Sequence, residues 1–202
     1  MRAIQLNANY EPLGIISWEK AFLKTFERKD KYDNYIWEAK AEILYTYPDR
    51  TIRGVTDEWP LPAIIILKNS VRQKKLSRMV NPSKRSILIR DLYTCQYCGE
   101  KVSNNSGTRD HVHPESRGGK ATWDNLVACC NICQDKKADR TCEESDMYPR
   151  KTPREPTIFE RFRNAIRVAT ATERRTWIAG LKKIGLLKII KNELTDDDDG
   201  TD

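Results

Sequence analysis

The chain has 202 residues, enough for one sizeable domain or for a small domain with flanking elements. Its 36 Lys and Arg against 29 Asp and Glu give a net charge of +7, which favours a polyanionic partner, although basic charge can also serve solubility alone. No apolar run approaches the roughly 20 residues that cross a bilayer, and the first residues are too polar for a secretory signal, so we expect a cytoplasmic protein.

Residues 1–80 are predicted to form a small mixed α/β unit that ends in a basic arm. Arg2–Leu6 alternates like a short strand, and Ser17 can cap a helix. Ala41–Tyr47 and Ala63–Leu67 are short apolar runs suited to strands. Nothing in this unit suggests catalysis.

The segment Val71–Arg90 contains seven bases and no acid, and its second half, Ser83–Arg90, is predicted to form a short helix. We interpret it as an arm that follows a phosphate backbone, with an ordinary solvated linker as the alternative. The bases are Arg72, Lys74, Lys75, Arg78, Lys84, Arg85 and Arg90.

Three further segments complete the predicted organisation. Residues 81–148 hold the chemically distinctive motifs. Residues 149–194 are predicted to form a separate pair of helices, because capping boxes begin at Thr157 and Thr170. Residues 195–202 contain five Asp and no base, so we expect an acidic, disordered tail.

Four cysteines form two C-x-x-C pairs within residues 81–148. Cys95 and Cys98 make the first pair, and Cys130 and Cys133 make the second. Two such knuckles can present four thiolates to one tetrahedral zinc, and a site closed by four thiolates is structural. A redox C-x-x-C is the alternative, but it usually occurs once. We therefore predict a structural zinc that holds a short, polar segment together.

Both histidines of the chain lie between the two cysteine pairs, in Asp110-His111-Val112-His113-Pro114. In a strand, residues 111 and 113 would share a face and Asp110 would point to the other. A lone histidine is usually structural, but two of them with an aspartate inside a zinc frame favour catalysis.

These residues resemble the cysteine-containing HNH endonucleases of bacteria and phages. The similarity opens with Arg90–Gly99 and continues through Asp110-His111 and Pro114. The similarity extends through residues 116–119, 122–127, 137, 139–141 and 143–144. It therefore covers roughly residues 84–147. The opening Leu6–Leu13 also resembles a leader that precedes this module in some bacterial members.

The resemblance implies an α+β chain built around a ββα-metal nuclease module with a structural zinc. It implies that His111 is the general base, that Asp110 binds a catalytic Mg²⁺ or Mn²⁺, and that Asn125 orients the strand bearing His111. Such roles suit phosphodiester hydrolysis, which needs a proton acceptor near pH 7 and a cation beside the phosphoryl oxygens. The expected products carry a 5′-phosphate and a 3′-hydroxyl.

Two positions raise alternatives. Gln134 stands where this family usually has the Asn or His that forms the second metal ligand, which puts metal binding and activity in doubt. His113 gives a local similarity to phage T4 endonuclease VII, which resolves branched DNA. His113 could act at the phosphate or the metal, or it could simply pack beside the hairpin.

We therefore predict a metal-dependent endonuclease that acts on DNA by nicking or double-strand cleavage. A non-catalytic zinc module that binds nucleic acid and a branched-DNA resolvase remain alternatives, as does a subunit of a larger DNA-processing complex. A homodimer could cut both strands. The expected phosphate contacts are Arg117, Lys136, Lys137, Arg140, Lys84 and Arg85.

Overall fold

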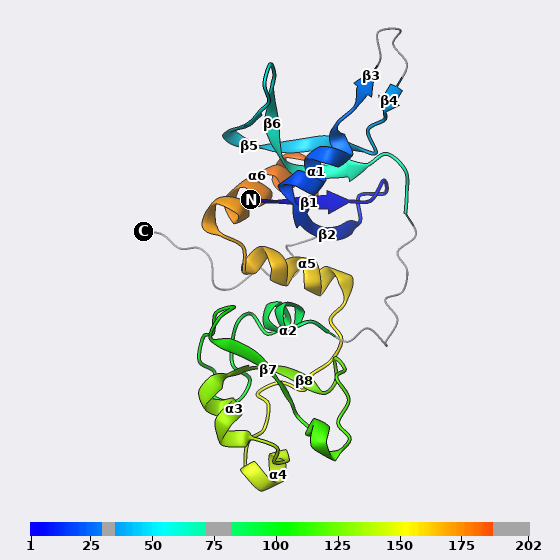
Figure 1. Cartoon of the computed structure of the whole chain (residues 1–202). Helices are drawn as coiled ribbons and strands as arrows, with labels where there is room; N and C mark the ends of the chain where they lie inside the picture. Colours follow the sequence, from blue (N-terminus) through cyan, green and yellow to red (C-terminus); the bar gives the residue numbers. More distant parts are fainter. Residues whose placement is uncertain (30–34, 72–81, 188–202) are drawn as a thin grey trace. The chain divides into compact units, whose positions relative to one another are not determined.

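The computed structural model describes residues 1–29, 35–71 and 82–187. These residues form two compact units, each with its own core (Figure 1). Unit 1 comprises the described parts of 1–72 and 165–202, and unit 2 comprises those of 73–164. Most of the predicted basic arm, residues 72–81, and the acidic tail, residues 195–202, lie outside the described residues.

Unit 1 is built on a four-stranded sheet in the order β2-β1-β6-β5. Strand β1 (Arg2–Leu6) is antiparallel to β2 (Pro12–Ser17) and parallel to β6 (Glu58–Leu67), while β5 (Ala41–Arg53) is antiparallel to β6. Two short strands, β3 (Arg28–Lys29) and β4 (Tyr35–Trp37), pair separately. Both strands predicted from apolar runs extend beyond those runs, because polar residues continue the pairing.

Helix α1 (Trp18–Thr25) follows β2 and contacts β6. The Ser17 side chain caps it by accepting a hydrogen bond from the Lys20 N–H, as predicted. Helix α1 thereby joins the β1–β2 hairpin to the rest of the sheet.

The C-terminal helix α6 (Ala171–Lys183) belongs to unit 1, packed on β5 and β6. Trp177 and Leu181 are fully buried, and the Glu173 carboxylate pairs with Arg2 of β1 at 2.7 Å. The capping box at Thr170 is present as predicted. The structure therefore divides the chain differently from the predicted separate pair of C-terminal helices, because α6 buries its apolar face against the N-terminal sheet.

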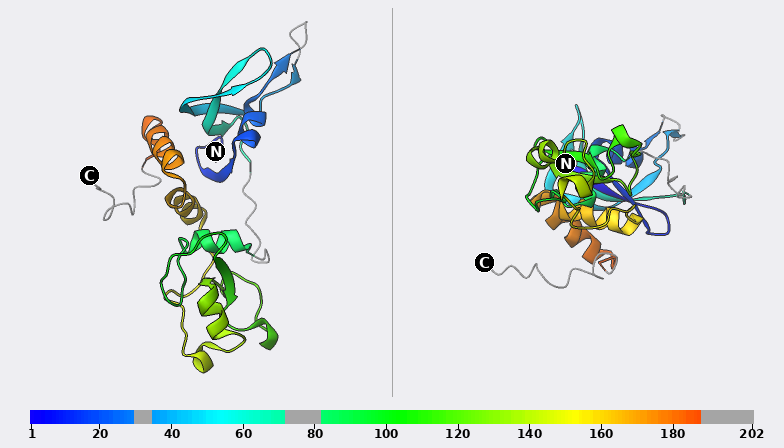
Figure 2. Two further views of the ribbon diagram at one scale, coloured as in Figure 1. Left: turned by 60° about the vertical axis from the view of Figure 1, so that its left-hand side comes forward. Right: turned by 90° about the horizontal axis from the view of Figure 1, so that it is seen from below.

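Unit 2 contains a ββα arrangement. Strands β7 (Gly107–His111) and β8 (Leu126–Cys130) form an antiparallel hairpin, and α3 (Asn131–Lys137) follows at once and lies beside it (Figures 1 and 2). This confirms the predicted α+β class with a ββα module. The remaining elements are α2 (Lys84–Arg90), the 3₁₀ turn η1 (Glu115–Arg117), α4 (Cys142–Ser145) and α5 (Ile158–Arg167), which begins in this unit.

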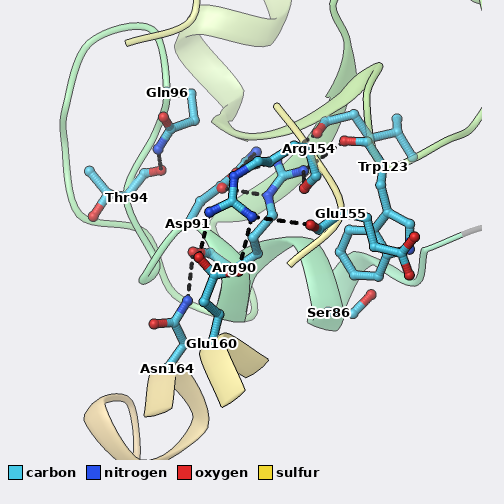
Figure 3. Close-up of polar contacts among 12 residues, drawn as sticks. Ser86, Arg90, Asp91, Thr94, Gln96, Trp123, Arg154, Glu155, Glu160 and Asn164 are labelled. Atoms are coloured by element: carbon cyan, nitrogen blue, oxygen red, sulfur yellow. Dashed lines mark hydrogen bonds and ion pairs between the residues drawn. The ribbon is translucent and has the colours of Figure 1, made fainter. Parts of the chain in front are cut away.

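The core of unit 2 includes a buried network around Arg90 (Figure 3). Its guanidinium pairs with both Asp91 oxygens at 2.8 and 2.9 Å and donates to the carbonyls of Trp123 and Leu126. Asp91 in turn accepts a hydrogen bond from the Ala128 N–H at 2.8 Å. Arg90 therefore ties α2 to β8 from within, and this corrects its inclusion in the phosphate-following arm.

No helix in the described part of the chain is both long and apolar enough to span a membrane.

Candidate active site and zinc centre

The four predicted cysteines converge. The sulfur atoms of Cys95, Cys98, Cys130 and Cys133 all lie within 4.8 Å of one another, and the Cys98 and Cys130 sulfurs are 3.9 Å apart. A Zn–S bond of about 2.3 Å puts the sulfurs of a tetrahedral site about 3.8 Å apart, so the cluster fits a zinc ion. The other two cysteines of the chain, Cys129 and Cys142, are buried outside this cluster.

Local structure explains this convergence. Gly99 adopts a φ of 83°, which lets the chain reverse after Cys98, and the N–H of Gly99 donates to the Cys95 carbonyl at 3.0 Å. Cys130 ends β8, and its sulfur accepts from the N–H of Cys133 in the first turn of α3. Although burial opposes its ionisation, backbone hydrogen bonds lower the pKa of Cys95 to about 7, whereas burial raises the pKa of Cys98 and of Cys133. A bound zinc ion would favour the thiolate form of all four cysteines, because the thiolate is the form that binds metal.

The β7–β8 hairpin carries the predicted catalytic pair at one end. Asp110 lies opposite Val127, and His111 lies opposite Leu126. The Asp110 side chain turns inward and is buried, whereas His111 is partly buried. The two neighbouring side chains therefore occupy different surroundings, as the alternation of a strand requires.

Asp110 is held by two buried partners. Its Oδ2 atom accepts a hydrogen bond from the Tyr97 hydroxyl at 2.7 Å and lies 3.1 Å from the Lys137 ammonium. Burial, and then the Asp110 carboxylate, raise the pKa of Tyr97, so that its hydroxyl keeps its proton and remains a donor. The other oxygen, Oδ1, has no protein partner among the described residues and could bind a cation.

Lys137 is fully buried, which corrects the phosphate contact expected for it. Besides pairing with Asp110, its Nζ atom donates to the His111 carbonyl oxygen at 2.7 Å. One ammonium group thus joins the last turn of α3 to both residues of the catalytic pair. It cannot reach a phosphate from this position.

The His111 ring has an unusual feature. Its Nε2 atom is buried, with no hydrogen-bond partner among the described residues. Buried polar atoms are nearly always paired in folded proteins, so an atom left without a partner favours a functional role at that position. If this nitrogen carries no proton, it can accept one from a water molecule that reaches it.

Asn125 fixes the chain that leaves β7. Its side chain accepts from the His113 N–H at 2.7 Å and donates to the carbonyls of His113 and Lys120, each at 3.0 Å. Its own carbonyl accepts from the Val112 N–H at 2.8 Å. The backbone just after His111 is therefore held by one amide side chain.

The remaining predicted residues fall into three groups. His113 is exposed, and its Nε2 atom lies 3.1 Å from the Arg117 carbonyl, which ties the ring to the following loop. Arg117 pairs with Glu144 at 2.6 Å, and Arg140 donates to carbonyls at the end of α3. Lys84, Arg85 and Lys136 are exposed, and Gln134 is half-buried on α3.

A second dense ligand cluster is absent from the described residues. Within the part of the chain that the structure describes, the only group of three or more His, Cys, Asp or Glu side chains close enough to share a metal is the cysteine cluster. A catalytic divalent ion would therefore depend on Asp110 and on an amide such as Gln134, a donor set that suits hard cations but supplies one negative charge.

Sequence reasoning missed Tyr97 and the internal use of Lys137. Tyr97 sits within the first C-x-x-C, and nothing in the motif singles it out. A tyrosine at the base of a knuckle nevertheless needs a partner for its hydroxyl when buried, which is the one signal that could have suggested an acceptor such as Asp110.

Residues 95–148 match a protein-family model described as HNH endonuclease. The match covers the cysteine cluster, the β7–β8 hairpin and α3, and it confirms the resemblance for this segment. A comparison with curated proteins gave no match for the chain. The segment is thus similar to the HNH endonucleases, and its cysteine cluster is compatible with a structural zinc.

Proposed function

We propose that this chain is a metal-dependent endonuclease that hydrolyses phosphodiester bonds in DNA, with His111 as the general base. The unpartnered Nε2 atom of His111 carries this proposal, because it lies in a segment that matches the HNH endonucleases. The basic net charge of +7 suits a polyanionic substrate.

The proposed reaction is attack by water on the phosphorus atom. His111 takes the proton of that water at Nε2 while the new P–O bond forms. The bond to O3′ breaks, and O3′ takes a proton from solvent, which leaves a 5′-phosphate and a 3′-hydroxyl. A divalent ion held by Asp110 Oδ1 and Gln134 would offset the charge on the phosphoryl oxygens.

The other residues position this pair. Lys137 holds the carbonyl of His111 and the Oδ2 atom of Asp110, so that Oδ1 is the oxygen left for a cation. Asn125 holds the backbone of His113 and thereby the end of β7. The zinc cluster keeps β8 and α3 together at the base of the hairpin.

A non-catalytic zinc module that binds nucleic acid is the second candidate, and one observation favours it. Asp110 already pairs with Lys137 and Tyr97, and a carboxylate whose charge is offset within the protein holds a cation less firmly. Gln134 in place of the usual ligand points the same way.

A plasmid assay separates the two candidates. Zinc-loaded protein is incubated with supercoiled DNA in the presence of Mg²⁺, of Mn²⁺, or without added divalent ion. The proposal expects nicked or linear product only with added metal, and its loss in Asp110→Ala. Binding without any cleavage under all three conditions would support the non-catalytic module. Preferential cutting of a four-way junction over linear duplex would instead indicate a resolvase.

A further inference from the structure

Unit 1 gathers three lysines around one pocket. Lys24 lies near the end of α1, Lys40 just before β5 and Lys68 just after β6. All three line a pocket of about 430 Å³, which we call the lysine pocket. Its remaining lining residues are Glu38, Ala39, Leu67, Asn69 and Val71.

Backbone hydrogen bonds hold the three lysine-bearing segments side by side. The Lys40 N–H donates to the Lys24 carbonyl at 2.8 Å, and the Lys68 N–H donates to the Lys40 carbonyl at 3.0 Å. Positions far apart in the sequence are therefore fixed next to one another by the fold. The convergence does not depend on the flexible side chains.

The pocket has an excess of positive charge. No ion pair joins Lys24, Lys40 or Lys68 to an acid among the described residues, and Glu38 is the one carboxylate in the lining. Lys24 donates to the amide oxygen of Gln5 at 2.6 Å, which satisfies one proton but supplies no negative charge. Burial, and then the positive charges of Lys20 and Lys40, lower the pKa of Lys24. An anion in the pocket would relieve this repulsion.

Asn7 anchors the chain at the edge of the same pocket. It is 3% exposed, its amide nitrogen donates to the Val71 carbonyl at 3.1 Å, and its amide oxygen accepts from the Val71 N–H at 2.9 Å. Val71 lines the pocket and directly precedes Arg72, Lys74, Lys75 and Arg78 in the sequence. Asn7 thus fixes the backbone of Val71 at the edge of the pocket. This gives the Leu6–Leu13 motif a physical role.

We propose that the lysine pocket is a phosphate-binding site through which unit 1 binds the backbone of a nucleic acid. The identity of that polyanion rests on the proposed nuclease function, whereas the phosphate site itself does not. Contacts of this kind add affinity and fix the position of the duplex, but they carry no sequence information.

The test compares two triple variants of the full, zinc-loaded chain. The pocket variant combines Lys24→Gln, Lys40→Gln and Lys68→Gln. The control variant combines Arg50→Gln, Arg175→Gln and Lys182→Gln. The control residues are exposed bases of the same unit that lie outside the pocket, so both proteins lose the same charge. Binding of a fluorescein-labelled DNA duplex is followed by anisotropy over a salt series, without added Mg²⁺ or Mn²⁺ so that no cleavage occurs. Thermal unfolding checks that both variants remain folded.

Each phosphate contact contributes about 0.9 to the slope of log affinity against log salt. We expect the pocket variant to lose roughly two to three units of slope and at least about tenfold in affinity at low salt, and the control to lose less than one unit. Equal slopes and affinities in the two variants would overturn the proposal.

Two further arms complete the design. Calorimetric titration with inorganic phosphate and with ATP tests for a free ligand. Saturable ATP binding that needs the pocket lysines, with unaltered DNA binding, would overturn the nucleic-acid assignment.

Plasmid cleavage by the wild type is measured separately. If DNA binding needs the pocket lysines but the wild type does not cleave, the proposed nuclease function is wrong and the phosphate site is supported. If the pocket variant binds and cleaves DNA like the wild type, the phosphate site is wrong and the nuclease function is supported.

Discussion

The two units of this protein are stabilised in different ways. Unit 1 buries a continuous apolar layer in which Ile4, Ile64, Ile65, Trp177 and Leu181 are fully enclosed. Unit 2 has short elements, and inside it lie buried ion pairs and a cluster of four cysteines. Hydrophobic burial can hold a sheet without special chemistry, but it cannot hold a carboxylate and an imidazole in a fixed arrangement. Unit 2 also has an apolar core, and the buried ion pairs set within it are the groups that can position reacting side chains.

Loss of zinc should produce the largest difference between the units. Structural zinc sites contribute about 10–16 kcal/mol of folding free energy in small metallo-peptides, so Cys133→Ser should unfold unit 2 and leave unit 1 folded. The buried indoles of Trp123 in unit 2 and Trp177 in unit 1 report the two separately. NMR of the indole N–H signals, with zinc content measured in parallel, checks this. Retention of both signals in a zinc-free protein would contradict a structural role for the metal.

Replacement of Lys137 should show that buried charge supports unit 2. Lys137→Met removes one partner of a buried pair, and such changes cost about 3–5 kcal/mol. Lys136→Met, which changes an exposed neighbour on the same helix, should stay within about 0.5 kcal/mol. Denaturant unfolding of unit 2 measures both. Equal stability of the two variants would mean that Lys137 is not buried against Asp110 as described.

A smaller effect is expected from overpacking in unit 1. A Cβ atom added at Gly180 would lie 2.6 Å from Ile64 Cδ1 and 2.7 Å from the Tyr45 ring, so Gly180→Ala should cost about 1–3 kcal/mol despite the better helix propensity of Ala. Calorimetry should show a lower melting temperature for unit 1 alone. A higher one would mean that α6 does not pack closely on β5 and β6.

The smallest effect is a pH dependence confined to unit 1. Burial opposes ionisation of Glu173, but Arg2 and the hydrogen bonds from Thr170 together outweigh it and hold the pKa of this carboxyl below its ordinary value. The stabilisation is therefore present above the unfolded pKa of about 4.3 and is lost as pH falls through the lowered folded value. Unfolding of the wild type and of Glu173→Gln from pH 7 to acid measures it. The gap between them should narrow towards low pH, and a constant gap would contradict the pairing.

Local signals in the sequence predicted much of this fold. Strand β1, the caps at Ser17 and Thr170, and the cysteine cluster all follow from residues close together in the chain. The assignment of α6 to unit 1 did not follow, because its partner Arg2 lies 171 residues away. The apolar face of a helix predicts that the helix packs on another element, but it does not identify that element.

The sequence predicts which residues form the candidate site better than it predicts which of them contact one another. Asp110, His111 and Asn125 were singled out, and their proposed roles remain to be tested. The sequence predicts Lys137 to be an exposed phosphate contact, but the side chain is buried and pairs with Asp110 of a different element. Lysine is almost never fully buried unless it is paired, and this partner could not be identified from the sequence. Long-range pairs between charged residues are what single-sequence patterns cannot supply.

The rate of plasmid nicking by His111→Ala, set beside that of His113→Ala, tests the central claim most directly. General-base catalysis contributes about 10²–10⁴-fold, so His111→Ala should lose at least about a hundredfold with Mg²⁺ or Mn²⁺ present. His113→Ala, whose ring contacts only the following loop, should retain most of its activity. Cleavage by His111→Ala at the wild-type rate would contradict the assignment of His111 as the base.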